Sequence, residues 1–202
     1  YLTISKSFFE NGNGIKSFKI INKFQDNFTK SLAYIDIVQI LIDVNKKKDA
    51  RKIVDTVFDL ILKIDDYETK SLLYVKILKN LLQLSEINLT KETLNKVLKI
   101  SKFSNSDAQI SRIQCDLCTI MMKIGMEKKA IKIASEIEDD FYLPDAILNI
   151  FKEYLLLDKV DEAISLIKSN YDLIFWKISS SIVLELSKVN KINEAIQFAD
   201  SL

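Results

Sequence analysis

A short motif centred on alanine recurs along this chain. Asp161-Glu162-Ala163-Ile164 returns as Asn193-Glu194-Ala195-Ile196, and weaker copies surround Ala130 and Ala50. The last three of these alanines are 33 and 32 residues apart. A repeat at this period is typical of tandem helical hairpins, each of which covers its apolar face with its neighbours. The repeat therefore predicts an array of similar units rather than a single enzyme core.

The periodicity of the apolar residues predicts an all-α fold. The 202 residues include three glycines and one proline, which leaves few of the turn residues that a β-sheet needs. Ile and Val favour strands by propensity, but here they recur every three or four residues instead of alternating. One such apolar stripe consists of Ile113, Leu117, Ile120, Met121 and Ile124. Because each stripe must be covered by neighbouring helices, we expect the hairpins to stack.

We expect a single domain over residues 1–202, built from about five antiparallel hairpins. A second repeat supports the division, because Thr29-Lys30-Ser31-Leu32 returns 40 residues later as Thr69-Lys70-Ser71-Leu72. The turn signal Asn11-Gly12-Asn13-Gly14 precedes a lone helix over residues 15–27, which we interpret as half of an incomplete hairpin. The full hairpins are predicted at residues 31–64, 69–102, 107–137, 144–170 and 175–202.

Polar residues and one glycine mark the predicted helix ends. Asp107, Asp161 and Asn193 stand where an N-cap side chain would accept hydrogen bonds from the first backbone N–H groups. Gly125 suits the left-handed conformation that often follows a helix. The last predicted helix is still in progress at Leu202, which favours a segment of a longer array.

The charge of the chain is balanced overall but uneven along its length. The formal net charge is +1, from 29 basic and 28 acidic residues. Residues 1–100 carry 17 basic and 12 acidic side chains, whereas residues 101–202 carry 12 and 16. Only Arg51 and Arg112 are arginines, and lysine lacks the planar fork that binds a phosphate group in two places. Nucleic acid is therefore disfavoured as a partner.

No residue set in the sequence predicts catalysis, a cofactor or a metal site. Cys115 and Cys118 have Cys-x-x-Cys spacing, but a structural zinc needs four ligands, and the chain has no histidine and no second cysteine pair. The lack of histidine also excludes Ser-His and Cys-His catalysis. Ser165 and Lys168 match a Ser-x-x-Lys spacing without its accompanying motifs. We therefore expect a protein that is not an enzyme.

The cysteine usage and the hydropathy favour the cytoplasm. Two cysteines on one predicted helix do not form a disulfide framework, which indicates a reducing compartment. The first residues contain no apolar signal region, and no apolar run is long enough to cross a bilayer. We expect a cytoplasmic protein without a membrane span, and the sequence indicates no particular oligomeric state.

The order of a helix, a tight turn and a second helix resembles the tetratricopeptide-like α-solenoids. The turn is carried by Asp158-Lys159-Val160 and Asn190-Lys191-Ile192 directly before the two best copies of the alanine motif, and the resemblance covers roughly residues 15–202. Tyr154 fits the aromatic position of the family, whereas Phe151 and Val183 stand where the family commonly packs Gly or Ala. The resemblance implies a right-handed superhelix whose first helices line a concave groove for a peptide or a partner helix.

If the resemblance carries over, polar residues of the first helices would contact the partner. Some of these residues lie fourteen or eleven residues before a repeat alanine, and others follow from the Thr-Lys-Ser-Leu alignment of the second hairpin. The partner-binding set implied in this way is Asp36, Gln39, Lys76, Lys79, Gln83, Asp116, Asn149 and Lys152. The alternative interpretation is that these side chains are simply a solvated surface.

Three functions follow as hypotheses. The first is a non-enzymatic scaffold that binds a peptide or helix of a partner protein in the groove. The second is a regulatory or targeting array of a larger enzyme or effector. The third, ranked last, is RNA binding by the basic N-terminal half, where Lys46, Lys47, Lys48 and Lys52 would follow the phosphate backbone.

Overall fold

The computed structural model describes the backbone of residues 2–200 and the side chains of residues 3–170 and 178–200. Across this range the regular structure consists of twelve α-helices and one 3-10 helix, without a strand. The prediction of an all-α fold is therefore confirmed. By its internal packing the chain divides into two compact units, Tyr1–Ser104 and Asn105–Leu202.

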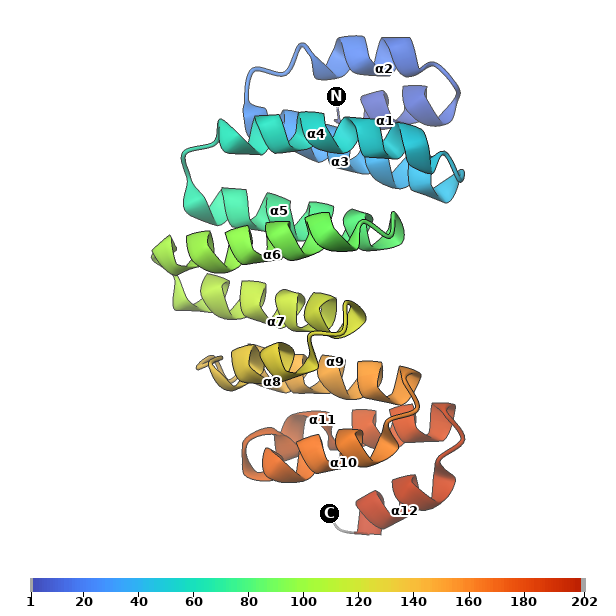
Figure 1. Ribbon diagram of the computed structural model, residues 1–202, viewed down its shortest axis with the longest axis vertical. Helices are drawn as coiled ribbons and strands as arrows, with labels where there is room; N and C mark the ends of the chain where they lie inside the picture. Colours follow the sequence, from blue (N-terminus) through green and yellow to red (C-terminus); the bar gives the residue numbers. More distant parts are fainter. Residues whose placement is uncertain (1, 201–202) are drawn as a thin grey trace. The chain divides into compact units, whose positions relative to one another are not determined.

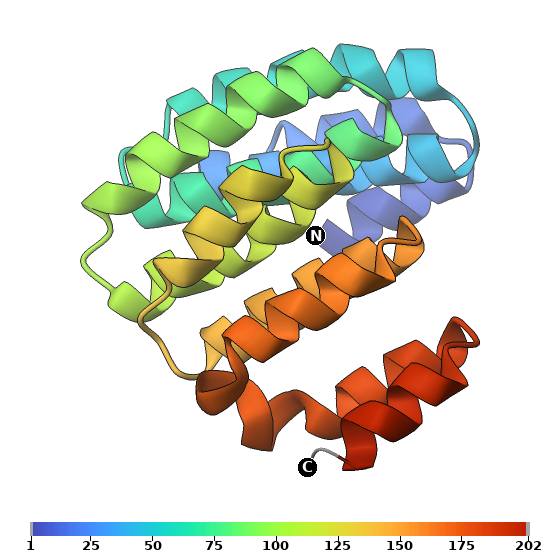
Figure 2. The ribbon, with the colours of Figure 1, turned by 60° about the horizontal axis from the view of Figure 1, so that its bottom comes forward.

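The first unit is a succession of antiparallel helix pairs (Figure 1). Its helices are α1 (Leu2–Glu10), α2 (Gly14–Ile21), α3 (Asn27–Asp43), α4 (Lys47–Leu62), α5 (Tyr67–Gln83), α6 (Ile87–Ile100) and the 3-10 helix η1 (Ser101–Phe103). The first helices of the pairs, α1, α3 and α5, pack against one another in series. The second helices α2 and α4 pack against their own partners and against the next first helix. Figure 2 shows α4 and α6 on the same side of α3 and α5.

The second unit has the same order of elements. Its helices are α7 (Asp107–Lys123), α8 (Glu127–Ser135), α9 (Tyr142–Leu156), α10 (Val160–Ser169), α11 (Tyr171–Lys188) and α12 (Ile192–Asp200). The first helices α7, α9 and α11 again pack in series, and α8 contacts both α7 and α9. Within each unit, the hairpins therefore bury their apolar sides against their neighbours, as the sequence predicts.

One turn geometry ends the first helix of every described hairpin. Each turn contains a residue with φ between 58° and 77°, and these residues are Gly12, Asn45, Ser85, Gly125, Asp158 and Asn190. The next residue donates its backbone N–H to a carbonyl five residues back, as from Lys46 to Leu41 at 2.7 Å and from Lys159 to Tyr154 at 2.9 Å. The left-handed residue itself donates three residues back. This pair of bonds defines the Schellman motif, which satisfies carbonyls that a helix end leaves without partners.

A small residue follows each left-handed residue at a distance of five positions, which we call the packing position. The packing positions are Ser17, Ala50, Thr90, Ala130, Ala163 and Ala195, and all are at most 4% exposed. They lie in the first turns of the second helices, close to the turn. Short side chains there allow the two helices of a hairpin to approach closely. The alanine repeat in the sequence is thus the packing position of the hairpin, and it also includes a serine and a threonine.

Apolar side chains of consecutive helices form the core of each unit. In the first unit Ile37 and Leu41 of α3, Ile77 and Leu81 of α5 and Val54 of α4 are at most 5% exposed. Complete burial of one such side chain stabilises the fold by roughly 1.5–3 kcal/mol. In the second unit Phe151 is fully buried, although the resemblance leads one to expect Gly or Ala there. The second unit therefore fills the space at this position with a large ring.

The structure differs from the prediction at the N-terminus. Residues 2–10 form α1, and the predicted lone helix 15–27 ends at Ile21, so the incomplete hairpin is a complete pair. Asp26 belongs to the start of the next helix, because its carboxylate accepts the N–H of Thr29 at 2.6 Å as the N-cap of α3. This hydrogen bond, the largest cause of the shift, lowers the pKa of Asp26. The prediction missed α1 because polar Thr, Ser and Lys residues separate the few apolar side chains of this short helix.

The three predicted N-caps were wrong. Ser106 caps α7, so Asp107 is the first helical residue. Helix α10 begins at Val160 after Lys159, and Asp161 lies in its first turn. Helix α12 begins at Ile192, which places Asn193 inside it. At α7 the hydroxyl of Ser106 accepts the N–H of Gln109 at 3.3 Å, which places the cap one residue earlier than predicted. For α10 and α12 the reason lies in the Schellman turn, because its last residue directly precedes the second helix and leaves no position for a separate cap.

We predict that Ser17→Ala stabilises the chain. Ser17 is fully buried, and its hydroxyl has no hydrogen-bond partner among the described residues. Removing an unsatisfied buried hydroxyl should raise the free energy of unfolding by about 1 kcal/mol, measured by urea denaturation. Thr90→Ala is the matched control, because the hydroxyl of Thr90 donates to the Glu86 carbonyl at 2.8 Å. A loss of stability in Ser17→Ala equal to that in Thr90→Ala would contradict this explanation.

Candidate functional site

The candidate site is one face of the first helices. Residues fourteen, eleven and seven positions before a packing position are spaced by three and four, so they lie on one side of a helix. We call this side the first-helix face. In the first unit it comprises Asp36, Gln39 and Asp43 on α3 and Lys76, Lys79 and Gln83 on α5. The two lysines and Gln83 are exposed, while Asp36 and Gln39 are half-buried.

Side-chain amides join α3 and α5 across this face. Gln39 donates its Nε2 to Oε1 of Gln83 at 3.0 Å, and Gln83 donates its own Nε2 back to Gln39 at 3.2 Å. Gln39 also donates to Asp43 at 2.7 Å. Beneath them the buried Asn80 donates its Nδ2 to the Ile35 carbonyl at 3.2 Å. The first-helix face of this unit therefore has a fixed arrangement of polar groups.

Charged pairs join the first helices of the second unit. Lys152 on α9 lies 3.5 Å from Glu185 on α11, and Lys123 on α7 lies 3.5 Å from Glu153 on α9. Glu185 also pairs with Lys188 at 3.0 Å. Burial raises the pKa of Glu185, but the hydrogen bond from Lys188 and the charge of Lys152 outweigh it, so the net shift is downward.

The structure brings some of the eight predicted residues together and leaves others apart. Gln39 and Gln83 contact each other directly. Asn149 donates its Nδ2 to Sγ of Cys115 at 3.8 Å, and Lys152 pairs with Glu185. Asp116 is half-buried on α7. The five predicted residues of the first unit and the three of the second unit therefore belong to separate faces, each described within its own unit.

The predicted site did not include the residues that lie ten positions before a packing position. Asn80, Glu153 and Glu185 occupy it, and each contacts the preceding first helix. A signal was available in the sequence, since Glu153 and Glu185 are 32 residues apart, the same interval as Ala163 and Ala195. The prediction included only polar residues expected to face solvent, whereas the side chains at this position contact a neighbouring first helix.

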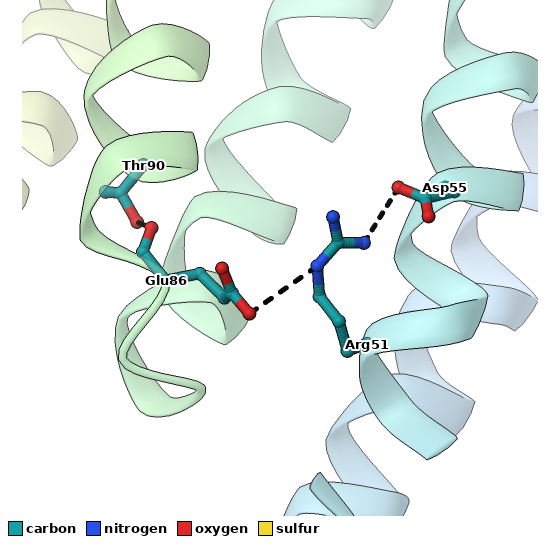
Figure 3. A network of polar contacts seen from close by, with 4 residues as sticks. All are labelled: Arg51, Asp55, Glu86 and Thr90. Atoms are coloured by element: carbon teal, nitrogen blue, oxygen red, sulfur yellow. Dashed lines mark hydrogen bonds and ion pairs between the residues drawn. The ribbon is translucent and has the colours of Figure 1, made fainter. Parts of the chain in front are cut away.

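Contacts between hairpins also occur at the Schellman turns. Arg51 of α4 places its Nη1 2.7 Å from Asp55 and its Nε 3.5 Å from Glu86 in the next turn (Figure 3). In the second unit Lys159 of one turn pairs with Glu127 of the preceding hairpin at 2.5 Å. These side chains are 30–68% exposed, so each pair contributes roughly 0.2–1 kcal/mol. Their main effect is to align one turn with the next.

The lysines considered for RNA binding already have local acceptors in part. Lys47 donates its Nζ to the Gln83 carbonyl at 3.1 Å, and Lys52 lies 3.3 Å from Asp49. Lys46 and Lys48 are exposed beside them. Two of the four ammonium groups thus already have an acceptor within the first unit.

The two cysteines do not form a reactive pair. Cys118 is fully buried, and its Sγ lies 3.4 Å from the Ala130 carbonyl, to which the thiol donates. Burial raises the pKa of Cys118 to about 12, so the thiol stays protonated at neutral pH. In the part of the chain that the structure describes, His, Cys, Asp and Glu side chains do not gather in groups of three that could hold a metal ion. The Cys-x-x-Cys spacing is therefore a feature of helix packing.

Glu185 should make the stability of the chain depend on pH. Its folded-state pKa is lowered, so its ion pairs stabilise the fold above the ordinary carboxyl pKa and are lost as the pH falls through the lowered value. Glu185→Gln should therefore lose stability at neutral pH and approach the wild type in acid, measured by urea denaturation at both pH values. Glu138→Gln, in an exposed loop, is the control. An equal loss at both pH values would show that the charge of Glu185 is irrelevant.

The comparisons with known proteins complete the description of the site. No family model matches the chain, and no curated protein matches its sequence. Among the described residues, none of the helices combines the length and the apolarity that a membrane span requires. The first-helix face is therefore the basis for assigning a function.

Proposed function

We propose that this chain is a non-enzymatic interaction scaffold, a tetratricopeptide-like α-solenoid that binds a peptide or helix of a partner protein on its first-helix face. The observation that carries the proposal is the serial packing of α1, α3 and α5, and of α7, α9 and α11, with second helices packed against them. Within each unit, serial first helices present their free sides as one surface. Such a surface suits an elongated ligand better than a small molecule.

The side chains of the first-helix face support binding of a peptide. Leu32 and Leu72 are half-buried on α3 and α5, one turn before Asp36 and Lys76. Apolar side chains supply contact area, whereas carboxylate, amide and ammonium groups orient a ligand by hydrogen bonds. The amide pair Gln39 and Gln83 holds part of this surface in place before a ligand arrives. A surface that is already ordered loses less entropy on binding.

The choice between a binding surface and a merely solvated one can be tested with matched variants. Peptides selected from a random library on the immobilised chain would be titrated into Asp36→Ala/Lys76→Ala. Both residues lie on the first-helix face. We expect affinity to fall by about tenfold or more, as for residues at the centre of an interface, measured by calorimetry. Urea denaturation of the same variant reports whether it remains folded.

The control variant is Asp59→Ala/Lys99→Ala. It removes one aspartate and one lysine that are exposed on the second helices α4 and α6. This variant should bind the selected peptides as the wild type does. If both double variants lose affinity equally, or if neither does, the first-helix face is not the binding surface.

A further inference from the structure

A cavity opens in the first unit between the first two hairpins. Its volume is about 570 Å³, within the range of sites that hold a small molecule. Its apolar wall includes Phe9 of α1 and Ile40 of α3, and Gly14 borders it at the start of α2. Its charged residues are Glu10, Asp43 and Lys46. Glu10 and Asp43 lie seven residues before their packing positions, so the cavity opens at one end of the first-helix face.

The junction between the second and third hairpins shows which group can occupy the place equivalent to this cavity. Gly14 lies three residues before the packing position Ser17, and Lys47 lies three residues before Ala50. Lys47 extends its ammonium group to the Gln83 carbonyl in the last turn of α5, at 3.1 Å. The corresponding residue at the end of α3 is Asp43, seven residues before Ala50. Gly14 has no side chain that could reach Asp43, and the cavity lies where such a side chain would extend.

The charges around the cavity favour a cation. Helices α1 and α3 both end there, at Glu10 and Asp43, and neither helix has a basic residue in its last turn. The C-terminal end of a helix carries a partial negative charge, which adds to the two carboxylates. Lys46 supplies one positive charge at the rim. The carboxylates and helix ends together outweigh this single ammonium group.

We propose that this cavity receives one lysine or arginine side chain of a bound peptide. The ammonium or guanidinium group would donate to the carboxylates of Glu10 and Asp43 and to the carbonyls at the end of α3, as Lys47 does one hairpin later. The alkyl stem would lie against Phe9 and Ile40. This inference rests on the proposed function, because it assigns a basic residue to the peptide that the first-helix face binds.

The three glycines of the chain provide a direct measurement. A chain labelled with ¹⁵N-glycine gives three amide signals, of which Gly12 and Gly14 border the cavity. Gly125 occupies the same turn position as Gly12 in another hairpin and serves as the internal control. N-acetyl-arginine methylamide should shift Gly12 and Gly14 in a saturable way, with a dissociation constant on the order of 1 mM for a ligand of this size. N-acetyl-citrulline methylamide, which is neutral and of similar shape, should shift neither.

Two variants of the full chain test the assignment of the site. Gly14→Lys places an ammonium group where Lys47 stands in the next hairpin, and it should abolish the response of Gly12 to the arginine probe. Gly14→Ala is its control, because a Cβ there meets Phe9 at an ordinary contact distance of 3.4 Å. Glu10→Gln/Asp43→Asn should weaken the arginine probe by about tenfold, since hydrogen bonds to charged acceptors are lost.

Several results would overturn the inference. These are equal shifts with the citrulline probe, a shift of Gly125 as large as that of Gly12, an unchanged response in Gly14→Lys, or no shift at probe concentrations on the order of 20 mM. The proposed function can fail separately. In that case the arginine probe would bind while Asp36→Ala/Lys76→Ala left peptide affinity unchanged. If instead only the probe fails to bind, the peptide still binds the first-helix face but needs no basic side chain.

Discussion

A left-handed residue closes each described hairpin at the end of its first helix and determines how the two helices meet. It reverses the chain within a few residues, and the Schellman bonds satisfy carbonyls that would otherwise be exposed or buried without partners. Because the turn has the same geometry in every described hairpin, the packing position always falls five residues later. A small side chain there sets the approach of the two helices. Ser85 adopts this conformation without the freedom of glycine, at a cost of roughly 1–2 kcal/mol, so the surrounding packing must hold it there.

The regular turn also decides which side chains of neighbouring hairpins meet. Buried apolar residues such as Leu81 and Phe151 supply most of the stabilisation, since each contributes more than an exposed ion pair does. Polar contacts at repeated positions, such as those of Asn80 and Glu185, align the first helices instead. With alignment fixed, the free sides of the first helices form one surface within a unit. Where a repeated contact is missing, as at Gly14, a cavity remains.

The sequence predicts the helices well because apolar spacing and turn residues are local signals. The all-α fold, the turn at Gly125 and the helix pairs from residue 27 onward all follow from such signals. Helix α1 does not, because it is short. The cap at Ser106 does not, because Ser and Asp are both good N-caps and stand next to each other there. The start of α10 after Lys159 does not, because it depends on the Schellman turn that precedes it. The contacts within the candidate site are harder to predict from the sequence. The spacing rule places Gln39 and Gln83 on one face, but their direct contact depends on the distance between α3 and α5, which only the folded chain determines.

Amide hydrogen exchange at the turns measures whether the Schellman bonds hold the hairpins together. The backbone N–H groups of Lys46, Glu86, Met126, Lys159 and Lys191 each donate to a carbonyl five residues back. We predict that these amides exchange as slowly as those in the last turns of their first helices, although the residues stand outside those helices. Asp65 and Glu138, which lie in links between hairpins, should exchange rapidly. If the five turn amides exchange as fast as Asp65 and Glu138, the turns do not hold the hairpins together, and the alignment of the first-helix face loses its physical basis.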